Sequence, residues 1–199
     1  MKIGVLALQG AFIEHIQMLR RLNVEAAEVR LPEHLHGLDG LIIPGGESTT
    51  IGKLAVMYGL MEPLRQFAAA RPVWGTCAGM IFMAKEIGNG QSGHDQPLLG
   101  VMDIVVERNA FGRQVDSFET DLTVSVFENG QSRPFPAVFI RAPRLVEVKG
   151  DARVIARLPN GTAVAAQQNK WLATSFHPEL TEDDRFHRYF VQLARNRQG

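Results

Sequence analysis

Cys77 is the only cysteine of the chain, and it lies inside a Gly-x-Cys-x-Gly frame that runs from Gly75 to Gly79. The apolar stretch 71–74 before this frame is typical of a buried strand, and the stretch 80–85 after it is typical of a helix. A strand that turns sharply into a helix through small residues is the nucleophile-elbow geometry, here with sulfur in place of a serine oxygen. A cysteine at a helix N-terminus feels the positive end of the helix dipole, which favours the thiolate. The pattern therefore predicts that Cys77 is a nucleophile.

A lone cysteine in an intracellular chain is more often a small buried hydrophobe, so this prediction needs a base and an orienting group. His177 and Glu179 offer both, because they follow a strand-like run at 171–176 and residues two apart in extended chain project to one side. Glu179 can accept a hydrogen bond from one ring nitrogen of His177 and leave the other nitrogen for the thiol. We therefore expect a Cys77–His177–Glu179 triad. The remaining histidines lack such a partner pattern and are expected to be solvated or structural: His15, His34, His36, His94 and His187.

A second glycine-rich segment, from Pro44 to Thr50, follows an apolar strand-like run at 40–43. If this run is parallel to the strand before Cys77, both segments lie at the carboxyl edge of one sheet, where ligands of open α/β sheets bind. The backbone N–H groups exposed by Gly46 can then hold an oxyanion together with the N–H of Ala78. The same segment also fits a tight strand-to-helix turn with Ser48 or Thr49 as the N-cap. The segment can be both an oxyanion-binding loop and such a turn.

The elements that position these residues alternate between strand and helix in the first half of the chain, which favours a parallel α/β sheet. Pro63 is expected to start a new helix within the second helical region. Hydrophobic spacing predicts strands at 2–8, 24–31, 40–43 and 73–75, and helices at 11–22 and across 49–69.

The second half of the chain has strand-like patterns, so we expect antiparallel strands added to the parallel core. The run 99–126 ends with alternating apolar residues, and Asn129-Gly130 and Asn160-Gly161 are hairpin signals. Residues 181–184 then cap a final amphipathic helix that reaches about residue 196. The apolar side chains expected to face inward on this helix are Phe186, Tyr189, Phe190 and Leu193.

The bulk composition is that of an ordinary globular protein. The chain has 199 residues, which fits one domain spanning 1–199, and 45% of them are hydrophobic. Acidic and basic residues balance at 21 each, so no strong field draws the chain to nucleic acid or to an anionic membrane. We see no 18-residue apolar span, no signal peptide and no disulfide framework, and we expect a cytoplasmic protein.

No cofactor or metal is expected. The sequence contains no zinc-ligand spacing and no phosphate-binding lysine loop. The spaced glycines at 88–93 fit a dinucleotide pattern, but they follow a helical region rather than a strand, so a loop is the better interpretation.

These motifs resemble the class I (triad) glutamine amidotransferases, and more narrowly the glutaminase subunits of pyridoxal 5'-phosphate synthase. The wider class is represented by Gly75–Gly79, Pro44–Thr50 and His177–Glu179. Ile81 occupies a position where many relatives in the wider class carry glutamine, which suits the vitamin B6 branch. The narrower resemblance is carried by Ala7-Leu8-Gln9-Gly10-Ala11, by Glu107 to Gln114 and by Phe139-Ile140-Arg141-Ala142-Pro143.

The resemblance implies a three-layer, flavodoxin-like α/β fold and hydrolysis of L-glutamine to glutamate and ammonia through a glutamyl thioester. It also implies that the partner that uses the ammonia is a separate (β/α)₈-barrel synthase subunit. Gln9 is expected near the oxyanion hole. By the same resemblance, glutamine is held by Gly46, Glu47, Ser48, Arg108, Ile140 and Arg141.

Three alternatives stay open. The first is a glutaminase that hydrolyses glutamine in the same way but serves a different synthase, as in the glutaminase of imidazole glycerol phosphate synthase. The second is a non-enzymatic thiol sensor with a cysteine on the same elbow, which has no need of His177 and Glu179 together. The third is a thioester or peptide hydrolase, which is favoured only if glutamine fails as a substrate.

Overall fold

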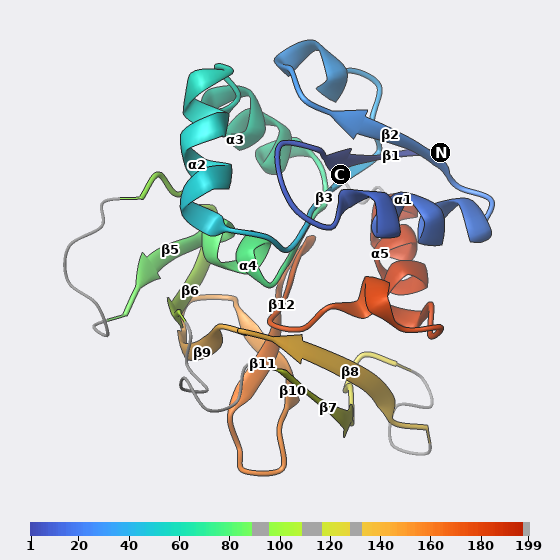
Figure 1. The fold of residues 1–199 in the computed structure, drawn as a ribbon, viewed down its shortest axis with the longest axis vertical. Coiled ribbons are helices and arrows are strands. Elements are labelled where there is room, and N and C mark those ends of the chain that lie inside the picture. The colour runs from blue at the N-terminus through green and yellow to red at the C-terminus, as the bar shows by residue number, and fades with distance from the viewer. Residues whose placement is uncertain (89–95, 109–116, 128–132, 197–199) are drawn as a thin grey trace.

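The computed structural model describes residues 1–88, 96–108, 117–127 and 133–196. Five strands of the central sheet are parallel, in the order β2-β1-β3-β4-β12 (Figure 1). This is the order of flavodoxin-like sheets, so the expected α/β fold is confirmed. The five strands are β1 (Lys2–Leu6), β2 (Glu25–Val29), β3 (Gly40–Ile43), β4 (Val73–Thr76) and β12 (Trp171–Thr174).

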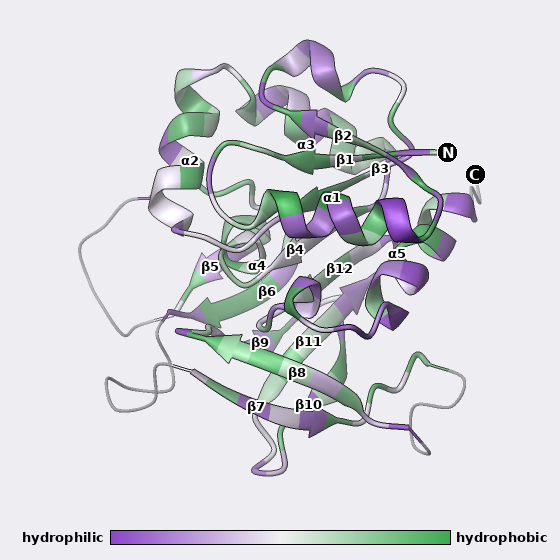
Figure 2. Ribbon diagram, turned by 45° about the vertical axis from the view of Figure 1, so that its right-hand side comes forward, coloured by the Kyte–Doolittle hydropathy of each residue, from purple (hydrophilic) through white to green (hydrophobic). Residues whose placement is uncertain are grey.

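Helices cover both faces of this parallel part, because alternate residues of each strand enter different cores. On β3, Leu41 and Ile43 belong to the core that includes α2 and α3, whereas Ile42 belongs to the core that includes α1 and α5. Figure 2 shows the central strands largely in the hydrophobic colour, whereas α1 alternates along its length. The helices are α1 (Phe12–Arg21), α2 (Ser48–Met57), α3 (Met61–Ala70), α4 (Ala78–Met83) and α5 (Arg185–Arg195), with 3-10 turns η1 (Pro32–Leu35) and η2 (Pro178–Leu180).

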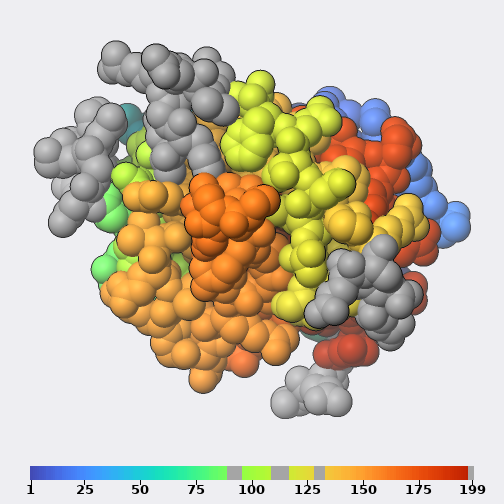
Figure 3. Space-filling view, turned by 90° about the horizontal axis from the view of Figure 1, so that it is seen from below, coloured from blue at the N-terminus to red at the C-terminus, as the bar shows by residue number. Residues whose placement is uncertain are grey.

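Antiparallel pairing extends the sheet beyond β12, as expected for the second half of the chain. The order continues as β12-β11-β9-β6-β5, β10 pairs with β11, and β7 and β8 form a separate two-stranded sheet. Seen from below in Figure 3, segments coloured yellow-green to orange, which belong to this half, occupy the middle of the face. The added strands are β5 (Ala84–Ile87), β6 (Met102–Glu107), β7 (Ser117–Leu122), β8 (Phe135–Ile140), β9 (Arg144–Val148), β10 (Arg153–Arg157) and β11 (Ala163–Gln168).

The hairpin predicted at Asn160-Gly161 is confirmed. It joins β10 to β11, and Gly161 has φ of +86°, a conformation that glycine adopts without strain. The final helix is also confirmed, with Phe186 and Phe190 fully buried.

One boundary was predicted wrongly. The helix after Cys77 ends at Met83, and the next residues form a strand, β5 (Ala84–Ile87), that pairs with β6 in parallel rather than antiparallel orientation. Because 78–84 is continuously buried and apolar, periodicity could not separate a buried helix from a buried strand. The predictions for the glycine run 88–93 beyond residue 88, for His94, for residues 109–114 and for Asn129-Gly130 lie outside the described residues.

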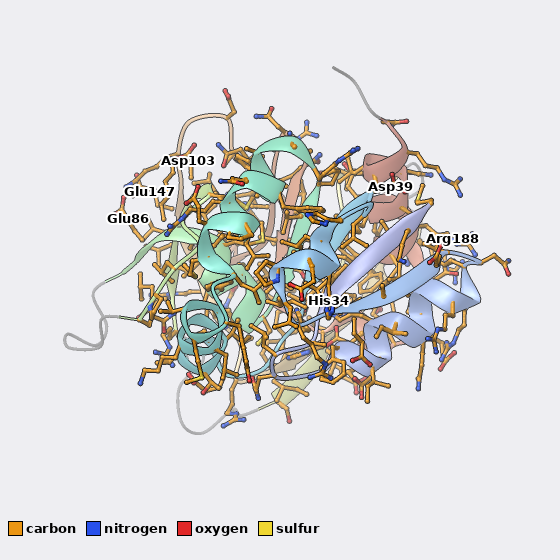
Figure 4. The ribbon with its side chains drawn as sticks, turned by 90° about the horizontal axis from the view of Figure 1, so that it is seen from above. His34, Asp39, Glu86, Asp103, Glu147 and Arg188 are labelled. Carbon is orange, nitrogen blue, oxygen red and sulfur yellow. The ribbon has the colours of Figure 1, made fainter. Side chains whose placement is uncertain are left out.

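The outer edge of the sheet carries several surface ion pairs. Figure 4 shows Glu86, Asp103 and Glu147 gathered at this edge, with His34 lying apart from them. Lys149 Nζ lies 2.9 Å from a carboxylate oxygen of Glu86 and 3.7 Å from one of Glu147, and Lys85 pairs with Asp103. Exposed pairs of this kind contribute little to stability. Within the described ranges, no helix has both the length and the apolar character that crossing a membrane requires.

Candidate active site

The carboxyl ends of the parallel strands form the site. The loop after β1 carries Gln9, the loop after β3 carries Gly45 and Gly46, β4 leads into Cys77, and β12 leads toward His177. In an open α/β sheet this edge is where the strand ends leave a crevice for a ligand. The topology thus brings together residues that are far apart in the sequence.

Cys77 occupies a strained elbow. It follows β4 directly and precedes the first residue of α4, and its backbone has φ of +49° and ψ of −107°. Non-glycine residues rarely adopt a positive φ, and residues held in such conformations cluster at active sites. The backbone N–H of Cys77 donates to the carbonyl of Thr174 at 2.7 Å, which ties the elbow to the neighbouring strand.

The two glycines of the frame are needed because the elbow packs backbone against backbone. A Cβ atom on Gly79 would lie 2.0 Å from the carbonyl oxygen of Ile43, and one on Gly75 would lie 2.5 Å from the backbone of Gly79. Side chains larger than hydrogen therefore do not fit at either position. The Gly-x-Cys-x-Gly spacing follows from how β3, β4 and α4 meet.

His177 and Glu179 form a buried pair beside the elbow. The Nδ1 atom of His177 lies 2.7 Å from Oε1 of Glu179, and the backbone N–H of His177 donates to the carbonyl of Val138 at 2.8 Å. Burial lowers the pKa of His177, but hydrogen bonds with Cys77 and Glu179 outweigh it and raise the pKa to about 10. Burial raises the pKa of Glu179, but His15 and His177 together lower it below its ordinary value.

The thiol is the remaining partner of the imidazole. Nδ1 of His177 is taken by Glu179, so Nε2 is the ring nitrogen left for Cys77, whose presence helps to raise the pKa of His177. The sulfur also lies 3.9 Å from the carbonyl oxygen of Ile140 at the end of β8. The three groups can thus support an ion pair between thiolate and imidazolium, which is the reactive form of a cysteine nucleophile.

The backbone around the elbow offers donors for a negatively charged oxygen. Ala78 is the first residue of α4, where a backbone N–H has no acceptor within its own helix. Gly46 is exposed on the neighbouring loop, and Gln9 lies against it, because the Oε1 atom of Gln9 accepts from the N–H of Glu47 at 2.7 Å. The two residues expected to form the oxyanion hole therefore lie at the same edge of the sheet, Ala78 at the start of α4 and Gly46 on the loop after β3.

Glu47, not Ser48 or Thr49, is the N-cap of α2, which corrects our interpretation of this turn. Its carboxylate accepts from the N–H groups of Thr49 at 3.0 Å and of Thr50 at 2.7 Å. Burial raises the pKa of Glu47, but these hydrogen bonds and that of the Thr50 hydroxyl lower it to about 2. Glu47 is therefore an anion at neutral pH.

Arg108 places a positive charge next to this anion. One nitrogen of its guanidinium lies 3.1 Å from Oε1 of Glu47. The side chain of Arg108 is 34% exposed, so the pair stands at the surface of the site rather than in the core. A neighbouring cation and anion match the carboxylate and ammonium groups of a free amino acid. Ile140 and Arg141 are also exposed, and Arg141 has a positive φ of +42°.

Gln96 was missed by sequence reasoning and connects three of these residues. Its Oε1 atom accepts from the hydroxyls of Ser48 and Thr49, each at 3.1 Å, and from Arg108 at 3.0 Å. Because a guanidinium has only donors, the atom facing Arg108 must be the amide oxygen, which fixes the orientation of the amide. No local motif points to Gln96, since its partners come from distant parts of the sequence.

Gln96→Leu is expected to lower the free energy of unfolding by about 1–3 kcal/mol, because Ser48, Thr49 and Arg108 lose their acceptor. We also expect the KM for the substrate to rise about tenfold, since Arg108 loses one of its anchors and keeps only Glu47 and Thr49. Urea denaturation and steady-state kinetics measure the two effects. Gln66→Leu is the matched control, because Gln66 is exposed and makes one 3.3 Å hydrogen bond to Glu62. An unchanged KM in Gln96→Leu would contradict this role.

The other histidines divide into two groups. His34 and His36 are exposed, as expected. His15 and His187 are fully buried, and His15 Nε2 lies 3.4 Å from Oε2 of Glu179, so His15 does have a charged partner. Our view that His15 lacks a partner pattern was therefore wrong. The contact joins α1 to η2, and no sequence spacing reveals it.

Comparison with known proteins decides the family. Residues 5–196 match the SNO glutamine amidotransferase family. The chain belongs to this family. A pyridoxal 5'-phosphate synthase subunit PdxT of Dehalococcoides mccartyi is 62% identical over 198 residues, covering 98% of each chain. The protein of the same name from Herpetosiphon aurantiacus is 59% identical over 194 residues, covering 97% of this chain and 100% of that one.

Solved structures agree with this membership. A structure described as a glutamine amidotransferase superposes with a TM-score of 0.88 at 53% identity, covering 96% of this chain and 98% of that one. A chain in the structure of PurLQS from Thermotoga maritima has a TM-score of 0.71 at 15% identity over 96% of this chain and 97% of its own, and shows only that the fold is shared. The resemblance inferred from the motifs is thus confirmed at the level of family and fold.

Proposed function

We propose that the chain is the glutaminase subunit of a pyridoxal 5'-phosphate synthase. It hydrolyses L-glutamine to L-glutamate and ammonia and delivers the ammonia to a separate synthase subunit. The observation that carries the proposal is Cys77 at positive φ on the elbow, together with His177, whose Nδ1 is paired with Glu179 and whose pKa is raised by its interaction with Cys77 and Glu179. Membership of a glutamine amidotransferase family and relatives named as subunits of pyridoxal 5'-phosphate synthase support it.

In the proposed reaction, the thiolate of Cys77 attacks the side-chain carboxamide carbon of glutamine. The N–H groups of Gly46 and Ala78 hold the negative charge that develops on the carboxamide oxygen. His177 gives its proton to the leaving nitrogen, so ammonia departs and a glutamyl thioester remains on the sulfur. His177 then takes a proton from water, which attacks the thioester and releases glutamate. Glu179 keeps the imidazole oriented through both steps.

The backbone amino and carboxyl groups of glutamine are bound by the charged rim of the site. Arg108 pairs with the α-carboxylate and Glu47 with the α-ammonium, since the two side chains already form an adjacent cation and anion. Ser48, Ile140 and Arg141 complete the pocket around the substrate. This arrangement accepts free glutamine and disfavours a glutamine residue within a peptide, whose backbone nitrogen and carbonyl are uncharged amide groups.

A separate partner is part of the proposal, because free ammonia is protonated in neutral water and stops being a nucleophile. We propose that residues 1–199 form one glutaminase domain in the cytoplasm and that a (β/α)₈-barrel synthase subunit receives the ammonia by a sheltered path. Docking of this subunit organises the oxyanion hole. The contact between Gln9 and the Gly46–Glu47 loop supports this, since a movement of the N-terminal loop displaces the loop that carries Gly46.

The test is glutamate release from L-glutamine by the purified chain, measured without and with the synthase subunit. We expect slow release by the isolated chain and a large increase on mixing, together with formation of pyridoxal phosphate. The isolated synthase subunit, supplied with an ammonium salt, is the control: it should form pyridoxal phosphate without the glutaminase. No release in either condition would contradict a glutaminase, and full activity of the isolated chain would contradict control by docking.

A further inference from the structure

A line of buried polar groups continues inward from Glu179, on the side away from Cys77. Oε2 of Glu179 lies 3.4 Å from Nε2 of His15, and Nδ1 of His15 lies 2.9 Å from Nε2 of His187. Nε2 of His15 is also 3.3 Å from the hydroxyl of Thr76. Both imidazoles are fully buried, on α1 and α5, and both pack edge-on against Trp74, with ring centroids 5.6 Å and 4.9 Å from the indole.

Complete burial favours the neutral form of both histidines. Burial lowers the pKa of His187 to about 3. The pKa of His15 is also lowered to about 3, by burial and by His187 and His177, against the opposing effect of Glu179. Each ring therefore carries one N–H, and the two rings share one hydrogen bond, so only two arrangements of the protons are possible.

One arrangement is unfavourable at both ends. If His15 carries its proton on Nδ1 and donates it to His187, the Nε2 lone pair of His15 accepts from the hydroxyl of Thr76 but also faces the carboxylate of Glu179. The proton of His187 then sits on Nδ1, an atom with no hydrogen-bond partner among the described residues. A buried N–H without an acceptor is a costly defect.

The opposite arrangement removes both defects. His187 donates from Nε2 to Nδ1 of His15, and the Nε2–H of His15 donates to the hydroxyl of Thr76 while Nε2 lies 3.4 Å from Oε2 of Glu179. Only a lone pair on Nδ1 of His187 stays unpaired. Oε2 of Glu179 has no hydrogen-bond partner in the part of the chain that the structure describes, so the N–H of His15 acts on the free half of the carboxylate from 3.4 Å.

We propose that His15 is a positioning residue for glutamine hydrolysis, whose Nε2–H keeps Glu179 ionised and turned toward His177, with His187 holding His15 in the required tautomer. The inference rests on the proposed triad. A carboxylate that orients an imidazole must stay charged while the imidazole gains and loses its proton. At 3.4 Å the contact is longer than an ordinary hydrogen bond, and it acts as an oriented dipole in a water-free surrounding.

The experiment compares His15→Gln with His15→Asn in the full chain, assayed with the synthase subunit. A glutamine side chain places its amide nitrogen near the position of Nε2, whereas an asparagine places it near Nδ1 and cannot reach Glu179. We expect His15→Asn to lower kcat about 10- to 100-fold with KM within twofold, and His15→Gln to regain at least about tenfold of this loss. Equal activity of the two variants would overturn the proposal.

The pH profile of kcat/KM separates this role from a purely structural one. Without the N–H of His15, the pKa of Glu179 rises, so the acidic limb of the His15→Asn profile moves to higher pH. The other titratable groups that face His15 are His177 and His187, and both remain in the variant. An unmoved acidic limb would count against the proposal.

Glu179→Gln distinguishes failure of this inference from failure of the triad. If Glu179→Gln is fully active, the triad itself is wrong. If Glu179→Gln is impaired, His15→Asn should add little in that background, because the charge that His15 stabilises is gone. An undiminished loss in the double variant would show that His15 acts independently of Glu179.

A measurement on the unreacted protein needs no activity. Nitrogen NMR of histidine-labelled protein should show both His15 and His187 as neutral rings protonated on Nε2 between about pH 6 and 8, well above the lowered pKa of each ring. The Nε2–H signal of His15 should shift in Glu179→Gln. A ring of His15 protonated on Nδ1 would overturn the proposal whatever the kinetics show.

Discussion

Cys77→Ala is expected to abolish glutamine hydrolysis, lowering kcat by at least about 10⁴-fold. The methyl group of alanine cannot attack the carboxamide, so the thioester cannot form and the two-step reaction has no first step. Glutamate release in the presence of the synthase subunit is the measurement. Residual activity above about 1% of the unmodified chain would contradict the assignment of Cys77 as the nucleophile.

Cys77→Gly serves as the control for folding at the same position. Both variants lack the sulfur, but glycine adopts the φ of +49° without the strain that alanine retains. We expect the free energy of unfolding of Cys77→Gly to exceed that of Cys77→Ala by about 1 kcal/mol, as measured by denaturation. If Cys77→Gly is inactive and yet more stable than Cys77→Ala, the strained backbone at residue 77 costs stability and serves the reaction.

The second large effect is expected at Gly45. A Cβ atom at this position would lie 2.4 Å from Cε1 and 3.1 Å from Nδ1 of His177, and 3.3 Å from Cβ of Cys77. An alanine methyl group therefore pushes the imidazole away from both the thiol and Glu179. Displacements of about 1 Å in a catalytic group cost about 10²-fold, so we expect Gly45→Ala to lower kcat by about 10²- to 10³-fold.

Stability should change much less than activity in this variant. Inserting one methyl group into a packed site costs about 1–3 kcal/mol, so the chain is expected to remain folded in a thermal denaturation experiment. Gly88→Ala is the matched control, because Gly88 has no positive φ and a Cβ there would meet its nearest atom, on Val105, at 3.6 Å. Full activity of Gly45→Ala would mean that the imidazole does not rest against Gly45 during turnover.

Local sequence determined the elbow and the outline of the fold. Gly75, Cys77 and Gly79 stand between a strand pattern and a helix pattern, and such short-range signals act over a few residues only. Alternating strands and helices likewise predicted the parallel sheet, because each element must bury an apolar face against the next. The spacing of His177 and Glu179 similarly favoured a pair on one side of the chain.

Tertiary structure decided the contacts that close around these residues. The N-cap of α2 is Glu47 because the loop after β3 sets where the helix begins, and Ser48 is instead buried against Gln96. The end of α4 at Met83 is set by the pairing of β5 with β6, since a continuously apolar run fits a buried helix and a buried strand equally well.

The positions of Gln96 and His15 show why the residues that support the site could not be predicted from the sequence. Gln96 gathers donors from α2 and from the end of β6, and His15 reaches Glu179 only because α1 lies beside η2. Hydrogen bonds between distant segments produce no periodic pattern in the sequence. Periodicity indicates which way a side chain points, but it does not indicate which residue that side chain contacts. The sequence by itself therefore determined which groups can react, and only the folded chain decided which groups hold them in place.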